Sequence, residues 1–375
     1  MTPVPPSRVT LDSISIRDFR NIARADVALP PDGIALVGDN GQGKTNFLEA
    51  IAYLQLLRSM RGVRDRDLTR FGATAFHVAA ESSGTAVRRV GIGVDRSGKK
   101  RITLDGVETQ RLTDALGALP SVCFSPADIA LIAGAPAERR RYLDIALALS
   151  SKRYLAALRQ YRAALARRNA ALRQATRPGA RSSSVAAWEP ALAEHGATIV
   201  EERRAWVTEG GTEFARLCAD IGERAPMQIA YDSPLADAPD VRGALAEALQ
   251  RGRDHDARRM VTHAGPHRDD LAVTLGAREL RLVGSAGQQR TAAIALRLLE
   301  ASTLREAARA EPLVLLDDPF AELDARRAAR ILELLRAEER GQTIVAVPRD
   351  DDVPEAFTRL ERWRVTDGVL SGVDA

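Results

Sequence analysis

The sequence has very few cysteines and no long apolar run, and these absences exclude several classes of protein. Its 375 residues include only two cysteines, Cys123 and Cys218, which form neither a disulfide framework nor a metal-binding spacing. The sequence contains no run of about 18 apolar residues, which is the length that a membrane-spanning helix needs. The N-terminus also lacks the basic and apolar regions of a signal peptide. We therefore expect a cytoplasmic protein without a membrane segment. The composition, 45% hydrophobic and 28% charged with a net charge of +4, suits a folded chain with a mild preference for acidic partners.

Near the N-terminus, a glycine-rich segment stands between a strand pattern and a helix pattern. The apolar run 34–37 precedes it, and residues 46–58 follow with the pattern of an amphipathic helix. The segment contains G-x-x-x-x-G-K-[ST], whose backbone N–H groups cradle phosphates, whose lysine reaches the terminal phosphates and whose hydroxyl binds Mg²⁺. We predict an ATP site with Lys44 in a catalytic role and Thr45 as a ligand of Mg²⁺. The candidate ATP contacts in the loop are Gly38, Asp39, Asn40, Gly41, Gln42, Gly43, Lys44, Thr45 and Asn46.

A second part of the site is expected where an apolar strand pattern ends in two carboxylates. Residues 312–318 read Pro-Leu-Val-Leu-Leu-Asp-Asp, the arrangement of a Walker B strand. Asp317 is expected to hold Mg²⁺ beside Thr45, and Asp318 to orient the attacking water, so both are candidate catalytic residues. The alternative is that Asp318 only completes the outer shell of the metal.

Two further segments predict an ATP-binding cassette that acts as a dimer. Residues 285–289, Ser-Ala-Gly-Gln-Gln, begin a helix pattern and would present free N–H groups to an anion, and Asp324 follows Walker B in a short acidic loop. We call residues 285–289 the signature. A signature, then a Walker B strand, then an acidic loop is the order typical of an ATP-binding cassette. In that architecture the signature binds the γ-phosphate held by a partner, so we predict an ATP-dependent homodimer with two-fold symmetry. The signature contacts would be Ser285, Gly287 and Gln288. An ordinary helix cap is the alternative.

The middle of the chain has a different character from its two ends. Strand patterns occupy residues 9–37 and 74–107, whereas residues 145–188 contain nine basic residues and no acidic one. Apolar residues recur there at helical spacing, first at Tyr154, Leu158, Tyr161, Leu165 and Leu172, then at Trp188, Leu192, His195, Ile199 and Trp206. This pattern predicts an antiparallel helical hairpin turning at 176–184, with more helix to about residue 262. The expected fold is α/β: an ABC/SMC-type P-loop ATPase head with a mixed sheet, in segments 1–126 and 264–375, interrupted by a mainly helical lobe at 127–263.

Seven segments in this order resemble the RecF family of DNA repair ATPases, which are relatives of the SMC-type ATPases. They are spread over most of the chain, at Arg17–Asn21, Gly38–Ile51, Phe124–Asp128, Gly134–Asp144, Gly265–Asp270, Ser285–Arg290 and Leu316–Asp324. Ala127 departs from the family pattern, which has an acidic residue there. Pro348 also departs, in a segment where members more often read Thr-Thr-Asp. Neither position belongs to the phosphate-binding core.

The resemblance implies a DNA replication and repair protein that dimerises on DNA with ATP and hydrolyses it slowly, with stimulation by DNA. It implies duplex DNA or single-strand/duplex junctions as partners, and joint action with RecR and RecO in loading RecA at single-strand gaps, as part of the SOS response. By resemblance to related heads, Arg20 and Asn21 contact the nucleotide. The alternative for these two residues is a solvated strand edge.

Three basic clusters are candidates for contact with the DNA backbone. They are the helix 152–181, the run 139–141, and Arg58, Arg61, Arg64 and Arg66. The alternative for the helix is a solvated face, or ion pairs with acids of the second helix, namely Glu189, Glu194, Glu201 and Glu202. Since no aromatic residues are interleaved with the basic ones, we expect recognition of backbone and shape.

Two other classes of function remain open from the residues alone. An ABC transporter subunit would usually carry a histidine after the strand that follows Walker B, and residues 345–352 contain none. Asp318 also replaces the usual glutamate of such subunits. An ATPase of the overcoming-lysogenisation type with nuclease activity would need an acidic metal-binding domain, which the residues after Asp324 do not form.

Overall fold

The computed structural model describes residues 7–175, 183–319, 324–337 and 341–372. The chain forms two compact units. We call the first the head; it comprises Met1–Asp128, Asp220–Gly222 and Leu296–Ala375. We call the second the lobe; it comprises Ile129–Ala219 and Glu223–Ala295. Among the described helices, none is both long enough and apolar enough to cross a membrane.

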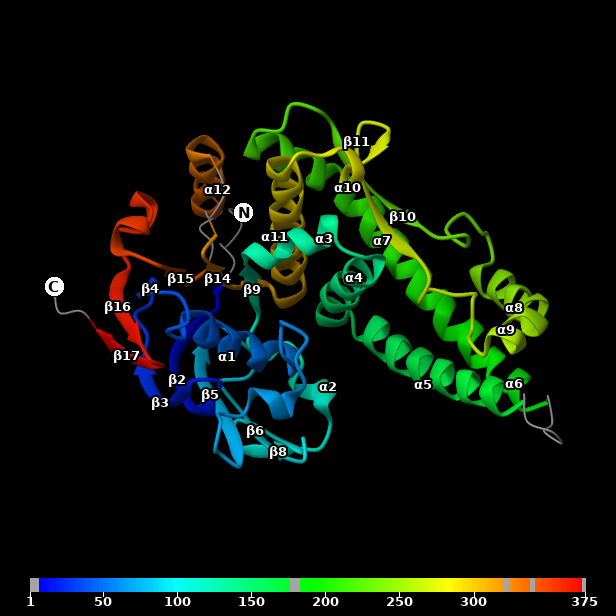
Figure 1. Cartoon of the computed structure of the whole chain (residues 1–375), viewed down its shortest axis with the longest axis horizontal. Coiled ribbons are helices and arrows are strands. Elements are labelled where there is room, and N and C mark those ends of the chain that lie inside the picture. The colour runs from blue at the N-terminus through cyan, green and yellow to red at the C-terminus, as the bar shows by residue number, and fades with distance from the viewer. Residues whose placement is uncertain (1–6, 176–182, 320–323, 338–340, 373–375) are drawn as a thin grey trace, which may run out of the picture. The chain divides into compact units, whose positions relative to one another are not determined.

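The head contains two six-stranded sheets, one antiparallel and one mainly parallel (Figure 1). The antiparallel sheet has the strand order β3-β2-β5-β6-β7-β8: Ile22–Ala28, Thr10–Phe19, Ala75–Ser83, Arg89–Asp95, Lys100–Leu104 and Val107–Thr109. The other sheet has the order β17-β16-β4-β15-β14-β9: Val369–Gly372, Glu361–Thr366, Gly33–Val37, Thr343–Val347, Leu313–Asp317 and Ser121–Phe124. β4, β15 and β14 run parallel, so their carboxyl ends lie at one edge of the sheet, where ligands bind in sheets of this kind.

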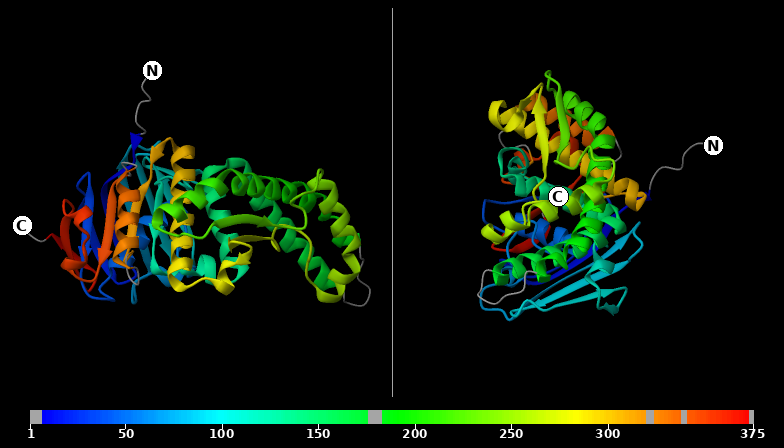
Figure 2. Two further views of the ribbon diagram at one scale, coloured as in Figure 1. Left: turned by 90° about the horizontal axis from the view of Figure 1, so that it is seen from above. Right: turned by 90° about the vertical axis from the view of Figure 1, so that its right-hand side faces the viewer.

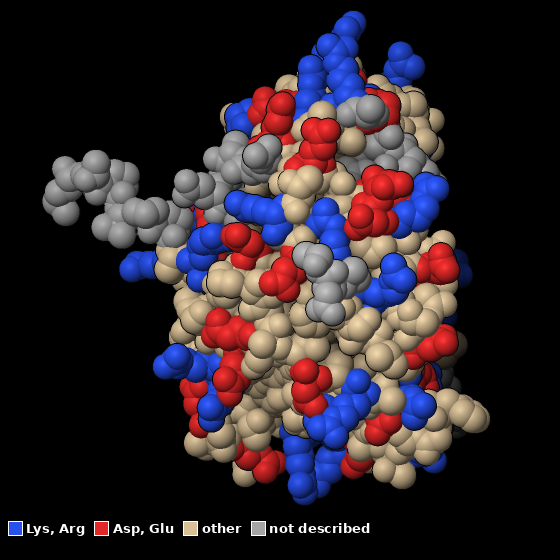
Figure 3. Space-filling view, turned by 90° about the vertical axis from the view of Figure 1, so that its left-hand side faces the viewer, with Lys and Arg blue, Asp and Glu red and all other residues tan. Residues whose placement is uncertain are grey.

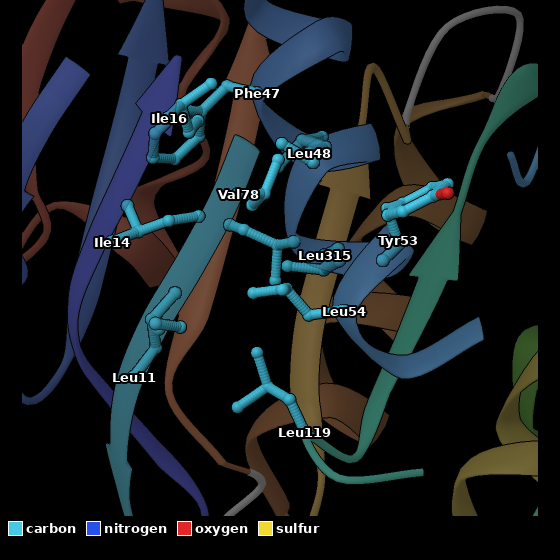
Figure 4. Close-up of a cluster of buried hydrophobic side chains, with 14 of the residues drawn as sticks. Leu11, Ile14, Ile16, Phe47, Leu48, Tyr53, Leu54, Val78, Leu119 and Leu315 are labelled. Carbon is cyan, nitrogen blue, oxygen red and sulfur yellow. The ribbon is translucent and has the colours of Figure 1, made fainter. Parts of the chain in front are cut away.

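Helix α1, Lys44–Leu56, lies between the two sheets of the head (Figure 4). Phe47, Leu48 and Leu54 are fully buried and belong to one cluster with Ile14 of the antiparallel sheet and Leu315 of the parallel sheet. The sequence predicted an amphipathic helix over residues 46–58. That prediction is wrong about the helix surface, because a helix between two sheets has no solvated face and buries almost every side chain.

The remaining elements of the head flank these sheets. They are the short pair β1 and β13 (Ser7–Arg8 and Ala310–Glu311), the small helix α2 (Leu112–Ala115), the second half of α11 (Ala286–Ala308), and α12 (Ala325–Ala337). Helix α11 is continuous, with its first residues in the lobe and residues from Leu296 onward in the head.

The lobe is built around the predicted helical hairpin. Its helices are α3 (Ala130–Ala133), α4 (Pro136–Ser150), α5 (Lys152–Ala175), α6 (Ser183–Ala186), α7 (Glu189–Ile221), α8 (Val241–Arg251), α9 (Arg253–Arg259) and α10 (Leu280–Val283). Helices α5 and α7 lie side by side and antiparallel (Figures 1 and 2), and Tyr154, Tyr161 and Leu192 of the predicted apolar stripes are buried. The predicted turn at 176–184 lies almost entirely outside the described residues.

The lobe also contains a three-stranded antiparallel sheet, of which the middle strand was expected from the sequence, from the strand pattern at residues 271–275. β10 (Met227–Asp232) lies in a region expected to be helical, and it pairs along its whole length with β11 (Asp270–Leu275), which in turn pairs with β12 (Arg278–Glu279). Because this pairing fixes β11 to the lobe, the compact unit extends to Ala295 rather than ending near residue 263.

Candidate nucleotide-binding site

The glycine-rich loop joins β4 to α1 at the carboxyl edge of the parallel sheet. Lys44 begins the helix, and its ammonium group donates to the loop carbonyls of Gly38 and Asp39, the latter at 2.9 Å. Burial lowers the pKa of Lys44, while the carboxylates of Asp317, Asp318 and Asp39 act in the opposite direction. The lysine therefore lies over the loop at the position from which it can reach bound phosphates.

Asn21 holds this loop from the turn between β2 and β3. Its side-chain amide donates to the carbonyl of Gln42 at 3.0 Å and accepts from the side chain of Asn46 at 2.8 Å. Gly43 has φ of 117°, and a Cβ there would lie 2.8 Å from the Asn21 amide, so only glycine suits this position. The structure thus places Asn21 against the phosphate loop, where it positions the backbone whether or not it also contacts a nucleotide.

Gln42 is held from a second side by the hairpin between β16 and β17. The backbone N–H of Asp367 donates to the Gln42 side chain at 2.6 Å, and that of Gly368 donates to its carbonyl at 2.8 Å. No local pattern in the sequence indicates this contact, because the partners are more than 300 residues apart.

The buried carboxylate of Glu49 connects the loop region to its neighbours. Arg20 donates to its two oxygens at 3.0 and 3.2 Å, and the Ser59 hydroxyl donates at 2.5 Å. Arg61 lies 3.8 Å away on the same carboxylate. In the structure, then, Arg20 is bound to helix α1 through Glu49. Glu49 is not among the predicted site residues, although an acid within an otherwise apolar helix is a signal of a buried ion pair.

The Walker B strand β14 brings Asp317 to the start of α1. The Thr45 hydroxyl donates to Asp317 Oδ1 at 2.8 Å, across 272 residues of sequence. Burial raises the pKa of Asp317, and the hydrogen bond from Thr45 and the charges of Arg61 and Lys44 partly oppose that rise. A hydroxyl and a carboxylate in contact are the hard oxygen ligands that Mg²⁺ takes beside a nucleotide, so this pair fits the predicted metal site.

Asp318 follows directly, with a left-handed backbone (φ 46°) fixed by its N–H donating to Ala346 at 2.9 Å. Its carboxylate acts electrostatically on both Lys44 and Asp317. Asp318 is therefore close to the predicted phosphate and metal positions, as a residue that orients water would be.

The signature segment lies in the lobe and caps helix α11. Ser285 accepts at its hydroxyl from the N–H of Gln288 at 3.3 Å, and the Gln288 side chain accepts from the N–H of Ser285 at 3.0 Å. This reciprocal pair is a capping box, so the alternative stated from the sequence is present. The capped serine is nevertheless exposed at a helix N-terminus, where an anion can also bind. Asp324 similarly caps α12 through the N–H of Arg327 at 2.9 Å, while residues 320–323 of the acidic loop lie outside the described part.

Comparison with known proteins agrees with this geometry. The family model described as "RecF/RecN/SMC N terminal domain" matches residues 10–369. A DNA replication and repair protein RecF from Roseiflexus castenholzii is 37% identical, over 95% of this chain and 98% of its own length. The chain belongs to the RecF family.

Other RecF proteins and structures support the same assignment. The RecF of Anaeromyxobacter dehalogenans is 37% identical over 96% of this chain and 98% of its own length. A solved structure of the recombination mediator protein RecF with ATP has a TM-score of 0.90 at 27% identity, covering all of both chains. An Smc head domain from Pyrococcus furiosus, with a TM-score of 0.54 at 18% identity over 97% of this chain and 96% of that one, shares the fold. These likenesses confirm the predicted ABC/SMC-type head with a second lobe and support an ATPase.

In the described part of the chain, most of the basic residues predicted for DNA in the lobe have internal partners. Arg139 is buried and donates to both oxygens of Asp270 at 2.8 and 2.7 Å. Arg168 of α5 is fully buried between Asp256 and Glu189, and Arg153 pairs with Glu201. The alternative of pairing with acids of the second helix therefore applies to Arg168 and Arg153. Arg177 and Arg181 lie outside the described residues.

The third basic cluster, in the loop after α1, is open to solvent, as are the basic residues of α5 other than Arg168 among those described. Arg61, Arg64 and Arg66 are exposed, and Phe71, further along the same loop, is fully exposed. Elsewhere, on the face drawn in Figure 3, basic and acidic side chains are interspersed rather than gathered by sign. By exposure, both the loop 58–71 and the exposed basic residues of α5 remain candidates for contact with a DNA backbone.

Proposed function

We propose that this RecF protein is an ATP-switched DNA-binding protein of recombinational repair. Two subunits would close head to tail around ATP, each supplying the Walker A and Walker B residues of one site and the signature of the other. Hydrolysis would be slow and stimulated by DNA, and would release the dimer. With RecR and RecO, the protein would help to load RecA at single-strand gaps in the cytoplasm. The solved RecF structure with ATP is of a recombination mediator in the RecFOR pathway, and this supports these partners.

The observation that carries the proposal is the separation of the ATP-site residues between the two compact units. Lys44, Thr45 and Asp317 meet in the head, whereas Ser285 is exposed at a helix N-terminus in the lobe. Ser285 and Gly287 are available to a γ-phosphate bound by a second subunit. The exposed side chains of Leu282 and Val283 directly before the signature are also suited to contact with another protein surface.

Each head residue has a role set by its position. The N–H groups of the loop 38–46 and the ammonium of Lys44 would bind the phosphates. Thr45 and Asp317 would hold Mg²⁺, which when bound neutralises charge on the β- and γ-phosphates. Asp318 would orient the attacking water. These roles are those of a phosphate-transfer site in which positioning and electrostatics supply the rate.

The test is the solution mass by light scattering, with and without Mg-ATP and gapped duplex DNA. We expect a monomer that becomes a dimer with ATP and is stabilised as a dimer by DNA. Ser285→Arg should stay monomeric while still binding ATP, and Lys44→Arg should fold but not hydrolyse. The matched control is Ser97→Arg, which places the same change on the exposed turn after β6. If Ser285→Arg dimerised as well as this control, the shared-site model would be wrong.

A further inference from the structure

A cavity of about 250 Å³ lies within the lobe, and its walls come from α4, α5, α7 and the loop before β11. Part of its lining, which we call the floor, is apolar: Leu158 and Ile199 are buried and Leu165 is half-buried. Four arginines also line it, Arg140, Arg141, Arg162 and Arg203, against one carboxylate, that of Asp144, so the formal charge of the lining is +3. None of these residues belongs to the nucleotide site.

The cavity already shows how it holds a carboxylate. Asp144 accepts from Arg203 at one oxygen and from Arg162 at the other, each at 2.7 Å. Arg203 also donates to the carbonyl of Pro266 at 2.8 Å, and its side chain is only 3% exposed, so it is fixed in place. Two guanidinium groups therefore converge on a single carboxylate at the wall of the cavity.

Arginine donors remain for a second anion. Among the described residues, Arg140 makes one hydrogen bond, to the carbonyl of Asp269 at 2.7 Å, and Arg162 makes one, to Asp144. A guanidinium has five N–H donors, so most of those on Arg140 and Arg162 face the cavity or solvent. The side chain of Arg162 is 56% exposed, which places it at the entrance.

His267 does not add to this charge. Its Nε2 lies 2.9 Å from the carbonyl of Thr262, which can only accept, so Nε2 carries the proton. Burial lowers the pKa of His267 to about 4, so the ring is neutral and its Nδ1 accepts from the Tyr161 hydroxyl at 2.6 Å. The positive charge of the cavity therefore comes from arginine alone.

We propose that this cavity binds an acidic segment of a partner protein, with an apolar side chain on the floor and flanking carboxylates on Arg140 and Arg162. The volume is below the range of about 300–1,000 Å³ typical of drug-sized ligands and suits one or two side chains. Charge complementarity selects an acidic partner. A DNA backbone is disfavoured as the ligand, because a phosphodiester is bound through polar contacts and the apolar floor of the cavity offers it no hydrogen-bond donor. The site does not depend on the proposed ATP-driven dimer.

The experiment measures fluorescence anisotropy of labelled short peptides with the full-length protein. The probe alternates aspartate and leucine, and two matched peptides replace either every aspartate by asparagine or every leucine by serine. We expect binding of the first peptide and at least about tenfold weaker binding of each matched peptide, as for loss of hydrogen bonds to charged groups or of buried apolar area.

The protein variants separate this cavity from a general basic surface. Arg162→Gln should weaken binding of the aspartate–leucine peptide about tenfold or more. Arg159→Gln, which changes an exposed residue of the same helix outside the cavity, should leave the affinity unchanged. The midpoint of thermal unfolding of both variants should be near that of the parent protein, since Asp144 keeps Arg203 as a partner. Lys44→Arg should bind the peptide normally, which separates this site from the ATP cycle.

Three results would overturn the proposal. One is failure of the aspartate–leucine peptide to bind. Another is equal weakening by Arg162→Gln and Arg159→Gln. The third is binding of a single-stranded oligonucleotide in place of the peptide with the same dependence on Arg162, which would make the cavity a nucleic-acid site.

Discussion

Replacement of Glu49 by glutamine tests how the head holds its phosphate-binding loop. The Glu49 carboxylate is fully buried and binds Arg20, Ser59 and, more distantly, Arg61. Removing one partner of a buried ion pair costs about 3–5 kcal/mol. The side chain of Arg20 is 19% exposed and that of Arg61 40%, so water will partly solvate both once the charge is lost. We therefore expect Glu49→Gln to destabilise the head by about 2–3 kcal/mol.

The assay is thermal unfolding followed by circular dichroism, together with titration of a fluorescent ATP analogue. A change of 1 kcal/mol shifts the midpoint of a domain of 150–250 residues by about 2–4 °C, so the midpoint should fall by about 4–12 °C. ATP affinity should fall as well, since Arg20 precedes Asn21, which positions the loop. The control is Glu81→Gln, which breaks a pair with Arg89 whose side chains are 52% and 69% exposed and should cost at most about 1 kcal/mol. Equal midpoints for the two variants would refute the reasoning.

Three further predictions follow from the site. Gly43→Ala should abolish ATP binding, as measured by titration, because its Cβ would meet the Asn21 amide at 2.8 Å and φ is 117°. Gly98→Ala, on an open turn with φ of 83°, is the matched control and should bind ATP normally. Asp317→Asn should abolish hydrolysis yet raise the thermal midpoint more at pH 8 than at pH 4. A carboxyl whose folded pKa is raised contributes stability at low pH and loses it as pH rises through that pKa; an unchanged midpoint at pH 8 would contradict this. Combined charge reversal at Arg64 and Arg66 should weaken DNA binding and reduce the slope of log affinity against log salt by about 1–2, whereas reversal at the exposed Arg242, which belongs to none of the three clusters, should leave the slope unchanged.

The grouping of Lys44, Thr45 and Asp317 could be predicted from the sequence because the two motifs that contain them are contiguous and each follows an apolar strand. The contact between Thr45 and Asp317 follows from two parallel strands that end at one edge of a sheet, which is a general rule of such folds. The roles of Arg139 and Arg168 could not be predicted in the same way. Their acidic partners Asp270 and Asp256 lie 131 and 88 residues away, and a run of arginines looks the same whether it faces DNA or a buried carboxylate.

Strand β10 was missed for a related reason. Met227 and Ile229 alternate with exposed residues, which is the pattern of a strand. The run is short, however, and the residue pattern on both sides of it is typical of helices. Its partner β11 begins only at Asp270, so local pattern gave no reason to pair them. Because that pairing assigns residues 264–295 to the lobe, the signature belongs to a different compact unit from the Walker motifs, whereas the sequence pattern placed all of them in the head.

This division bears on how ATP could control assembly. Leu282 is 71% exposed and Val283 is 42% exposed, and both immediately precede the capped Ser285. In the proposed dimer, this apolar pair and the serine would meet the partner surface together. A contact shifts the equilibrium toward the dimer only by the amount of free energy by which it favours the dimer over the monomer. The γ-phosphate, present with ATP and lost on hydrolysis, would add or remove the charged part of that contact while the apolar part stays constant. A modest apolar contribution would then keep the equilibrium close to balance, where loss of one phosphate is enough to reverse it.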